Sequence, residues 1–197
     1  MKEESHNPIA HFQQWFYEVE KAHPEDEVNI MSLSTIGNDG FPKNRIVLLK
    51  RFTWEGFYFF TNYNSEKGIA IRNNPLVSLS FFWKKAAREV HIYGKATKIP
   101  VNLSQGYFDS RPRGSQLSTW ASMQGSKIAS RKQLNEQLAH YDSLFRNKEI
   151  PMPAYWGGYL VSPKTITFID HKKNDKNHHL TYCLQKNYHW IKQTHSK

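Results

Sequence analysis

Hydrophobic positions near the start of the chain recur every three or four residues. Asn7 and Pro8 form a typical helix start, because asparagine caps the first amide groups and proline suits the first helical position. The apolar positions that follow at helical spacing are Ile9, Phe12, Phe16 and Val19. The pattern predicts one amphipathic helix over residues 8–22.

The period changes at residue 28 to the alternation typical of β-strands. Residues 28–36 and 44–52 each read as one strand, and the turn sequence GNDGF between them predicts a hairpin. Three further strands are predicted, at 56–62, 76–83 and 88–99, which makes five strands before residue 100.

A short helix is expected between the third and fourth of these strands, at residues 65–74. Ser65 can cap it, and the first amide groups of a helix have no partners within the helix. Such amide groups attract anions, and Lys67 adds a cation near the same end. This helix start is therefore a candidate phosphate site.

After Pro100 the pattern is helical again. Helices are predicted at 101–110 and 126–145, and the segment 111–125 between them is expected to be irregular. Strand character returns in 150–170, and a last hairpin over 180–193 turns at Lys186–Asn187. No repeat or linker is evident, so we expect a single domain over 1–197, of the α+β class and built on an antiparallel barrel.

Charge and cysteine content limit the possible functions. The formal net charge of +10 attracts phosphorylated small molecules, nucleic acid or an anionic membrane without choosing among them. Residues 171–197 hold six lysines against one acidic residue, Asp175, which is also typical of a solvated tail. The single cysteine, Cys183, excludes an intrachain disulfide. No signal sequence or membrane span is evident, so we expect a cytoplasmic protein.

Three cationic segments are candidates for anion binding. The strand NRIVLLK carries Arg45 and Lys50 near its ends, Lys67 begins the capped helix, and SRPRGSQ offers two arginines and hydroxyl groups. Taken singly, each is typical of ordinary surface charge. Together they indicate two phosphate sites.

Five segments, in this order and at this spacing, resemble the pyridoxine/pyridoxamine 5'-phosphate oxidases: RIVLLK, FFTNYNSEKG, NNPLVSLSFFW, YFDSRPRGSQLSTWASMQGS and PAYWGGYLVSP. The resemblance spans roughly residues 10–170. It implies an FMN-binding antiparallel split β-barrel of Greek-key topology with peripheral helices, which forms a homodimer with FMN at the interface. It also implies a small phosphorylated substrate, so nucleic acid and membrane are not the expected partners.

The resemblance also implies the site residues. Arg45 would meet the FMN phosphate, Lys67 would be its second cation, and Gln124 and Gly125 would reach the flavin from the other subunit. The full cofactor set that it implies is Arg45, Ile46, Val47, Leu48, Leu49, Lys50, Phe60, Thr61, Lys67, Glu89, Gln124 and Gly125. The implied substrate set is Lys50, Tyr107, Arg111 and Ser115, of which the last three would clamp the substrate phosphate. No catalytic residue beyond the flavin is expected, because FMN accepts the hydride and oxygen reoxidises it.

Two departures from the family pattern concern the cofactor. Glu66 stands where the family usually has a second cation beside Lys67, and a carboxylate there opposes phosphate binding unless it points away. Glu89 stands where a glutamine commonly contacts the flavin, and an ionised glutamate can accept hydrogen bonds but not donate them.

A further departure lies near the C-terminus. Ile169 replaces the family's flavin-contacting tryptophan, and Asp175 and Asn177 replace an arginine and a histidine that embrace the substrate ring. His179 replaces an FMN-binding arginine. The neighbouring His178 and His179 have no carboxylate or cysteine at a recognised metal-ligand spacing, so no metal is expected there.

Three functions therefore stay open at the level of the sequence. The first is oxidation of pyridoxine or pyridoxamine 5'-phosphate to pyridoxal 5'-phosphate, with Lys176, His178 or His179 substituting in the altered segment. The second is a flavin oxidoreductase with another substrate. The third is a non-enzymatic binder of FMN, vitamin B6 phosphate or nucleic acid, which the basic C-terminal stretch suggests.

Overall fold

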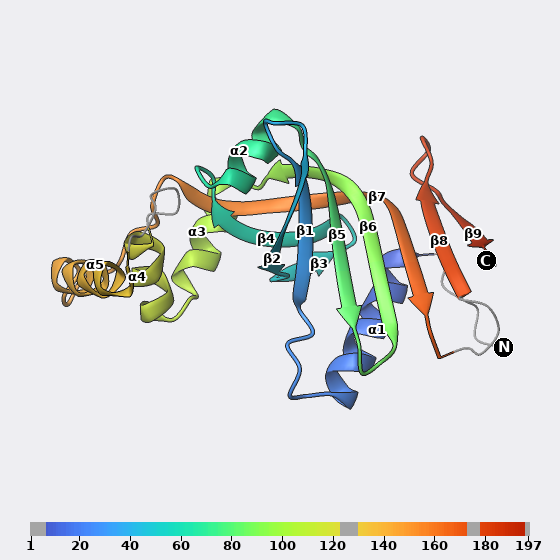
Figure 1. Ribbon diagram of the computed structural model, residues 1–197, viewed down its shortest axis with the longest axis horizontal. Coiled ribbons are helices and arrows are strands. Elements are labelled where there is room, and N and C mark those ends of the chain that lie inside the picture. Colours follow the sequence, from blue (N-terminus) through green and yellow to red (C-terminus); the bar gives the residue numbers. More distant parts are fainter. Residues whose placement is uncertain (1–6, 123–129, 173–177, 196–197) are drawn as a thin grey trace.

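The computed structural model describes residues 7–122, 130–172 and 178–195 of the 197-residue chain. These residues form five helices and nine strands (Figure 1). The helices are α1 (Pro8–Ala22), α2 (Glu66–Asn73), α3 (Val101–Asp109), α4 (Arg113–Ala121) and α5 (Arg131–Leu144). The strands are β1 (Ile30–Ile36), β2 (Pro42–Leu48), β3 (Arg51–Thr53), β4 (Gly56–Asn62), β5 (Leu76–Trp83), β6 (Arg88–Lys98), β7 (Trp156–Asp170), β8 (His178–Leu184) and β9 (Trp190–His195).

The strands form one antiparallel sheet in the order β2-β1-β5-β6-β7-β4-β3. The first part of β7, residues 156–161, pairs with β4, whereas residues 165–170 pair with β8. The sheet curls so that β2 and β4, which are not paired, come into contact (Figure 1). The predicted α+β class, with an antiparallel barrel-like sheet and peripheral helices, is confirmed.

Helix α1 packs its apolar face against the curled sheet, as its sequence pattern predicts. The Asn7 side chain accepts a hydrogen bond from the Ile9 amide at 2.9 Å, which caps the helix. Phe12 is fully buried, and its ring lies 4.9 Å from that of Phe57 and 5.1 Å from that of Phe81. This aromatic contact joins the helix to β4 and β5 and forms the centre of the main core.

The prediction of a single strand over residues 44–52 is wrong, because this segment is divided between two strands, β2 and β3. The Leu49 amide donates to the Asn29 carbonyl at 2.8 Å, and the next amide, that of Lys50, donates to the Tyr58 carbonyl at 2.9 Å. The chain thus leaves β1 and joins β4 within two residues. The change of partner divides the segment into β2 and β3, so six strands precede residue 100.

The segment 111–125 was expected to be irregular, and this is wrong for residues 113–121, which form α4. Leu117 and Ala121, one helical turn apart, are buried. Leu117 joins Phe108, Ile150 and Trp156 in a second, smaller core beneath α3, α4 and α5. Tertiary packing therefore overrides the weak helix propensity of the glycine, serine and threonine residues in this segment.

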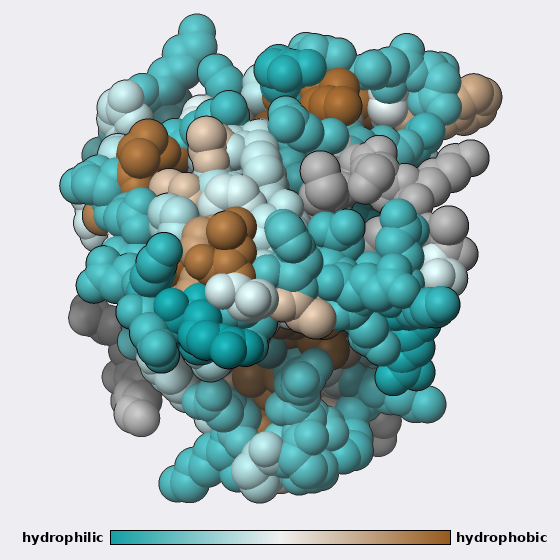
Figure 2. Space-filling model, turned by 90° about the vertical axis from the view of Figure 1, so that its left-hand side faces the viewer, coloured by the Kyte–Doolittle hydropathy of each residue, from teal (hydrophilic) through white to brown (hydrophobic). Residues whose placement is uncertain are grey.

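The three helices α3, α4 and α5 stand together at one side of the sheet (Figure 1). Seen from that side, the surface is mainly hydrophilic, with hydrophobic residues in small separate patches (Figure 2). Within the described residues, no helix has the length and apolar character required to cross a membrane.

Candidate functional site

A cavity of about 580 Å³ opens between strands β2 and β4, which do not pair with each other, and the helices α3 and α4. This volume is typical of small-molecule sites. Its lining consists of Ile46, Val47, Leu48, Lys50, Phe60, Thr61, Asn62, Lys67, Tyr107, Arg111, Pro112, Ser115, Ser118, Thr119, Ser122 and Trp156. Among these described residues there are three cations and no acidic side chain, so the cavity suits an anionic ligand.

One end of the cavity is the start of α2. The Ser65 hydroxyl caps the helix by accepting from the Gly68 amide at 3.3 Å, and Lys67 Nζ lies 3.4 Å from the same hydroxyl oxygen. Gly68 is required there, because an added Cβ would overlap the backbone of Tyr63. Burial, and to a smaller extent the charge of Arg45, lowers the pKa of Lys67. The negative charge of a bound phosphate would oppose both effects, because it favours the charged form of the amine.

Arg45 lies beside this end but does not line the cavity. Its guanidinium donates to Thr35 Oγ1 at 2.7 Å and to the Lys43 carbonyl oxygen at 2.8 Å. Burial lowers the pKa of Arg45, and the nearby Glu66 carboxylate partly offsets this. The side chain is therefore anchored close to Lys67, and the two charges repel each other until an anion is present.

Glu66 is held by another cation. Its Oε1 atom lies 2.9 Å from Lys43 Nζ, which also pairs with Asp39 at 3.0 Å. The hydrogen bond from Lys43 lowers the pKa of the Glu66 carboxyl. The carboxylate that departs from the family pattern is thus paired on the exposed side of α2 and does not line the cavity.

The opposite end holds Arg111. Its NH1 donates to Thr119 Oγ1 at 2.7 Å, and its guanidinium carbon lies 4.9 Å from the centre of the Trp156 ring. Burial lowers the pKa of Arg111 and raises that of the neighbouring Tyr107, so the phenol of Tyr107 stays protonated at neutral pH. Ser115 lines the same end of the cavity.

An aromatic wall connects the two ends. The Phe60 ring stacks on that of Tyr107 at 3.9 Å and on that of Trp156 at 5.4 Å. Gly158 on β7 makes room for this wall, because an added Cβ would lie 2.8 Å from Phe60 Cε1. A flat ring system is the ligand shape that such stacked side chains favour.

The structure brings together ten of the residues expected at the site. They are Ile46, Val47, Leu48, Lys50, Phe60, Thr61, Lys67, Tyr107, Arg111 and Ser115. Leu49 does not line the cavity, because its side chain is buried in the main core. Gln124, Gly125, Asp175 and Asn177 lie outside the described residues.

Glu89 is not brought to this cavity. It pairs across the sheet with Ile169, which in turn pairs with His179, so these three positions form one row on β6, β7 and β8. The row of neighbouring positions next to the cavity instead runs through Phe60, Gly158 and Ile99. Ile99 and Glu89 are ten positions apart, which is about 30 Å of strand at ~3.3 Å per residue. The Glu89 carboxylate lies 3.1 Å from His91 Nε2 and 2.9 Å from His171 Nε2.

Sequence reasoning missed six residues that line the cavity. They are Asn62, Pro112, Ser118, Thr119, Ser122 and Trp156. Three of them are hydroxyl residues on or next to α4, at helical spacing from Ser115. This spacing was the available signal, but it has meaning only once the segment is known to be a helix.

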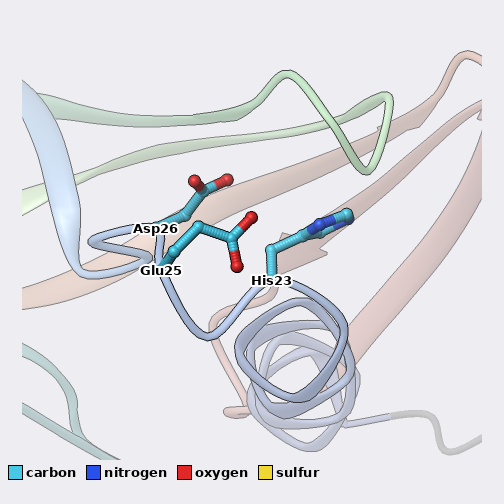
Figure 3. A group of neighbouring side chains, drawn as sticks. All are labelled: His23, Glu25 and Asp26. Atoms are coloured by element: carbon cyan, nitrogen blue, oxygen red, sulfur yellow. The ribbon is translucent and has the colours of Figure 1, made fainter.

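A second polar group follows α1. His23, Glu25 and Asp26 lie next to one another on one segment, close enough for their ligand atoms to approach a common cation (Figure 3). Lys85 already pairs with Glu25 at 2.6 Å and with Asp26 at 2.7 Å. Both carboxylates are exposed and already pair with this lysine, so we assign no metal to the group.

Comparisons with known proteins agree on one family. The family model described as pyridoxamine 5'-phosphate oxidase matches residues 20–141. A pyridoxine/pyridoxamine 5'-phosphate oxidase of Flavobacterium psychrophilum is 49% identical over 184 residues, which cover 93% of this chain and 86% of the relative. Its counterpart in Flavobacterium johnsoniae is 50% identical with the same coverage.

Solved structures share the fold. PhzG from Burkholderia lata, in complex with tetrahydrophenazine-1-carboxylic acid, matches with a TM-score of 0.90 at 19% identity, over 99% of this chain and 95% of that one. A pyridoxamine 5'-phosphate oxidase-related, FMN binding protein from Nostoc punctiforme matches with a TM-score of 0.76 at 12% identity, over 94% and 97%. The split-barrel fold expected from the sequence is confirmed over nearly the whole chain.

Proposed function

Because the chain belongs to the pyridoxine/pyridoxamine 5'-phosphate oxidase family, we propose that it binds FMN and oxidises pyridoxine or pyridoxamine 5'-phosphate to pyridoxal 5'-phosphate, with oxygen as acceptor. One observation carries the proposal. A single cavity has a cationic, hydroxyl-bearing end at Lys67, another at Arg111, and stacked aromatic rings between them. Two phosphorylated ring compounds side by side would use all three features.

The residues present suit FMN. At the α2 end, the amide groups and the half-buried Lys67, with Arg45 beside it, offer the donors and positive charge that a phosphate dianion requires. Thr61 and Asn62 follow along β4 and offer polar groups next to the apolar side chains of β2. When bound, FMN would supply the hydride acceptor, and oxygen would reoxidise it.

The residues at the other end suit a substrate phosphate. Arg111 offers a planar set of donors, and the protonated phenol of Tyr107 and the hydroxyl of Ser115 offer two more. Phe60 and Trp156 line the cavity and would cover one side of the space between the two phosphate sites. The chain's own residues would thus bind and orient the two ring systems.

We further propose that the site is completed by a second copy of the chain. Glu89, Ile169 and His179 occupy family positions for flavin contacts, yet they lie far along the sheet from the cavity of their own chain. The same face of the sheet carries exposed apolar side chains: Ile46, Leu76, Phe82 and Tyr93. Such a face is typical of an interface between subunits. Sedimentation should therefore give twice the chain mass, and a monomer that still binds FMN tightly would contradict this proposal.

Titration separates the proposed function from its alternatives. Flavin fluorescence should be quenched when FMN binds, and the loaded protein should form pyridoxal 5'-phosphate from pyridoxamine 5'-phosphate in air. Arg111→Ala should raise the KM for this substrate and spare FMN binding. Protein that binds FMN but turns over only other compounds would be an oxidoreductase with another substrate. Failure to bind FMN would refute the proposal.

A further inference from the structure

We propose that Thr119 is a positioning residue for the substrate-phosphate site, because its hydroxyl joins Arg111 to Ser115. The inference rests on the proposed function of that site. It concerns a residue that neither the family pattern nor the sequence motifs single out. Thr119 lies on α4, one helical turn after Ser115, and is 7% exposed.

The Thr119 hydroxyl is both an acceptor and a donor of hydrogen bonds. Oγ1 accepts a hydrogen bond from Arg111 NH1 at 2.7 Å and donates to the Ser115 carbonyl oxygen at 3.0 Å. A hydroxyl can both donate and accept, whereas valine, which has nearly the same shape, can do neither. One side chain therefore fixes the guanidinium relative to the helical turn that carries Ser115.

The remaining contacts of Arg111 are aromatic. Its guanidinium carbon lies 4.9 Å from the centre of the Trp156 ring and 5.8 Å from that of Phe108. Within the part of the chain that the structure describes, no carboxylate forms an ion pair with Arg111. A neutral hydroxyl and two ring faces orient the side chain without cancelling its charge, which stays available for an anion.

This arrangement has a consequence for binding. A long arginine side chain loses rotamer freedom when it is ordered, and that cost weakens ligand binding if it falls on the binding step. Thr119 orders Arg111 before the ligand arrives. Loss of the hydroxyl should therefore weaken binding of the phosphate group and leave the chemistry at the ring unchanged.

Two variants of Thr119 test the inference by steady-state kinetics. Thr119→Val removes the hydroxyl, and Thr119→Ser retains it. We expect Thr119→Val to raise the KM for pyridoxamine 5'-phosphate about tenfold, with kcat changed by less than about twofold, whereas Thr119→Ser should stay within about twofold of the wild-type KM. Equal loss in both variants, or an unchanged KM in Thr119→Val, would overturn the inference. FMN affinity serves as the control for folding, and Thr119→Ala replaces Thr119→Val if the latter does not bind FMN.

A binding experiment keeps this test separate from the proposed activity. Quenching of protein fluorescence gives the Kd for pyridoxal 5'-phosphate and for pyridoxal, which lacks the phosphate. Thr119→Val should lower the preference for the phosphorylated compound about tenfold, and should have no further effect when Arg111 is already alanine. An additive effect in the double variant would overturn the inference. If the wild type shows this preference but no turnover, the proposed activity fails and the role of Thr119 stands.

Discussion

Replacement of Lys67 by methionine should separate cofactor binding from folding. Lys67 is half-buried at the start of α2, where burial and the charge of Arg45 lower its pKa. Its folded-state pKa is therefore below that of the unfolded chain, so the charged amine opposes folding at neutral pH, and this cost fades as the pH rises toward the unfolded pKa. Methionine, of similar length, removes the cost. We expect the free energy of unfolding without FMN to stay the same or to increase.

The same change should weaken FMN binding. A hydrogen bond to a charged group is worth about 1.5–3 kcal/mol. At about 1.4 kcal/mol per factor of ten, Lys67→Met should raise the Kd for FMN by about 10- to 150-fold. Fluorescence titration measures the Kd, and urea unfolding of the FMN-free protein measures stability. Lys132→Gln, on the exposed face of α5, is the matched control and should change neither. A Kd within about twofold of wild type in Lys67→Met would mean that the phosphate lies elsewhere, and a parallel loss of stability would mean that Lys67 is structural.

Three further predictions follow from the charges and the core. Lys43→Gln releases the Glu66 carboxylate from its ion pair, and the Kd for FMN should then rise by about two- to fivefold at low salt. Adding Glu66→Gln should reverse this loss of affinity. An unchanged Kd in Lys43→Gln would show that Glu66 does not influence the phosphate site. FMN affinity should fall at alkaline pH, because the lowered pKa of Lys67 makes the amine lose its proton at a lower pH than an ordinary lysine does. The Lys67→Arg variant should retain its affinity at high pH. The same pH profile in both proteins would assign the effect to another group. Phe12→Ala should lower the free energy of unfolding, measured with urea, by about 3–5 kcal/mol, because Phe12 is fully buried among aromatic rings. Tyr17 is half-exposed, so Tyr17→Ala should lower it much less. Similar values for the two variants would contradict the described core.

Much of the fold was predictable because local signals and packing agree. The cap at Asn7, the cap at Ser65, the short apolar run of β4 and the alternation of β5 and β6 each determine an element whose bounds match the expectation within a residue or two. The break at Leu49 was not predictable from the strand-like sequence. It results from a change of hydrogen-bonding partner, from Asn29 to Tyr58, that only the closed sheet provides.

The candidate site, like the fold, was predictable from the sequence only in part. Lys67 and Arg111 were identified because cations next to hydroxyls and helix amides carry a recognisable signal, and the family motifs add the rest. Thr119 and Trp156 were missed as cavity residues, because their role depends on α4 being a helix and on β7 lying beside it. Pairing of Glu66 with Lys43, 23 positions earlier in the chain, also needed the folded structure.

The most direct test of the account is anaerobic mixing of FMN-loaded protein with pyridoxamine 5'-phosphate, followed by flavin absorbance. Transfer of a hydride from the substrate should bleach the flavin in the wild type, and admission of oxygen should restore the colour with formation of pyridoxal 5'-phosphate. Lys132→Gln should behave as the wild type, and Arg111→Ala should need a much higher substrate concentration. A flavin that is bound yet stays oxidised at saturating pyridoxamine 5'-phosphate and pyridoxine 5'-phosphate would contradict the proposed activity.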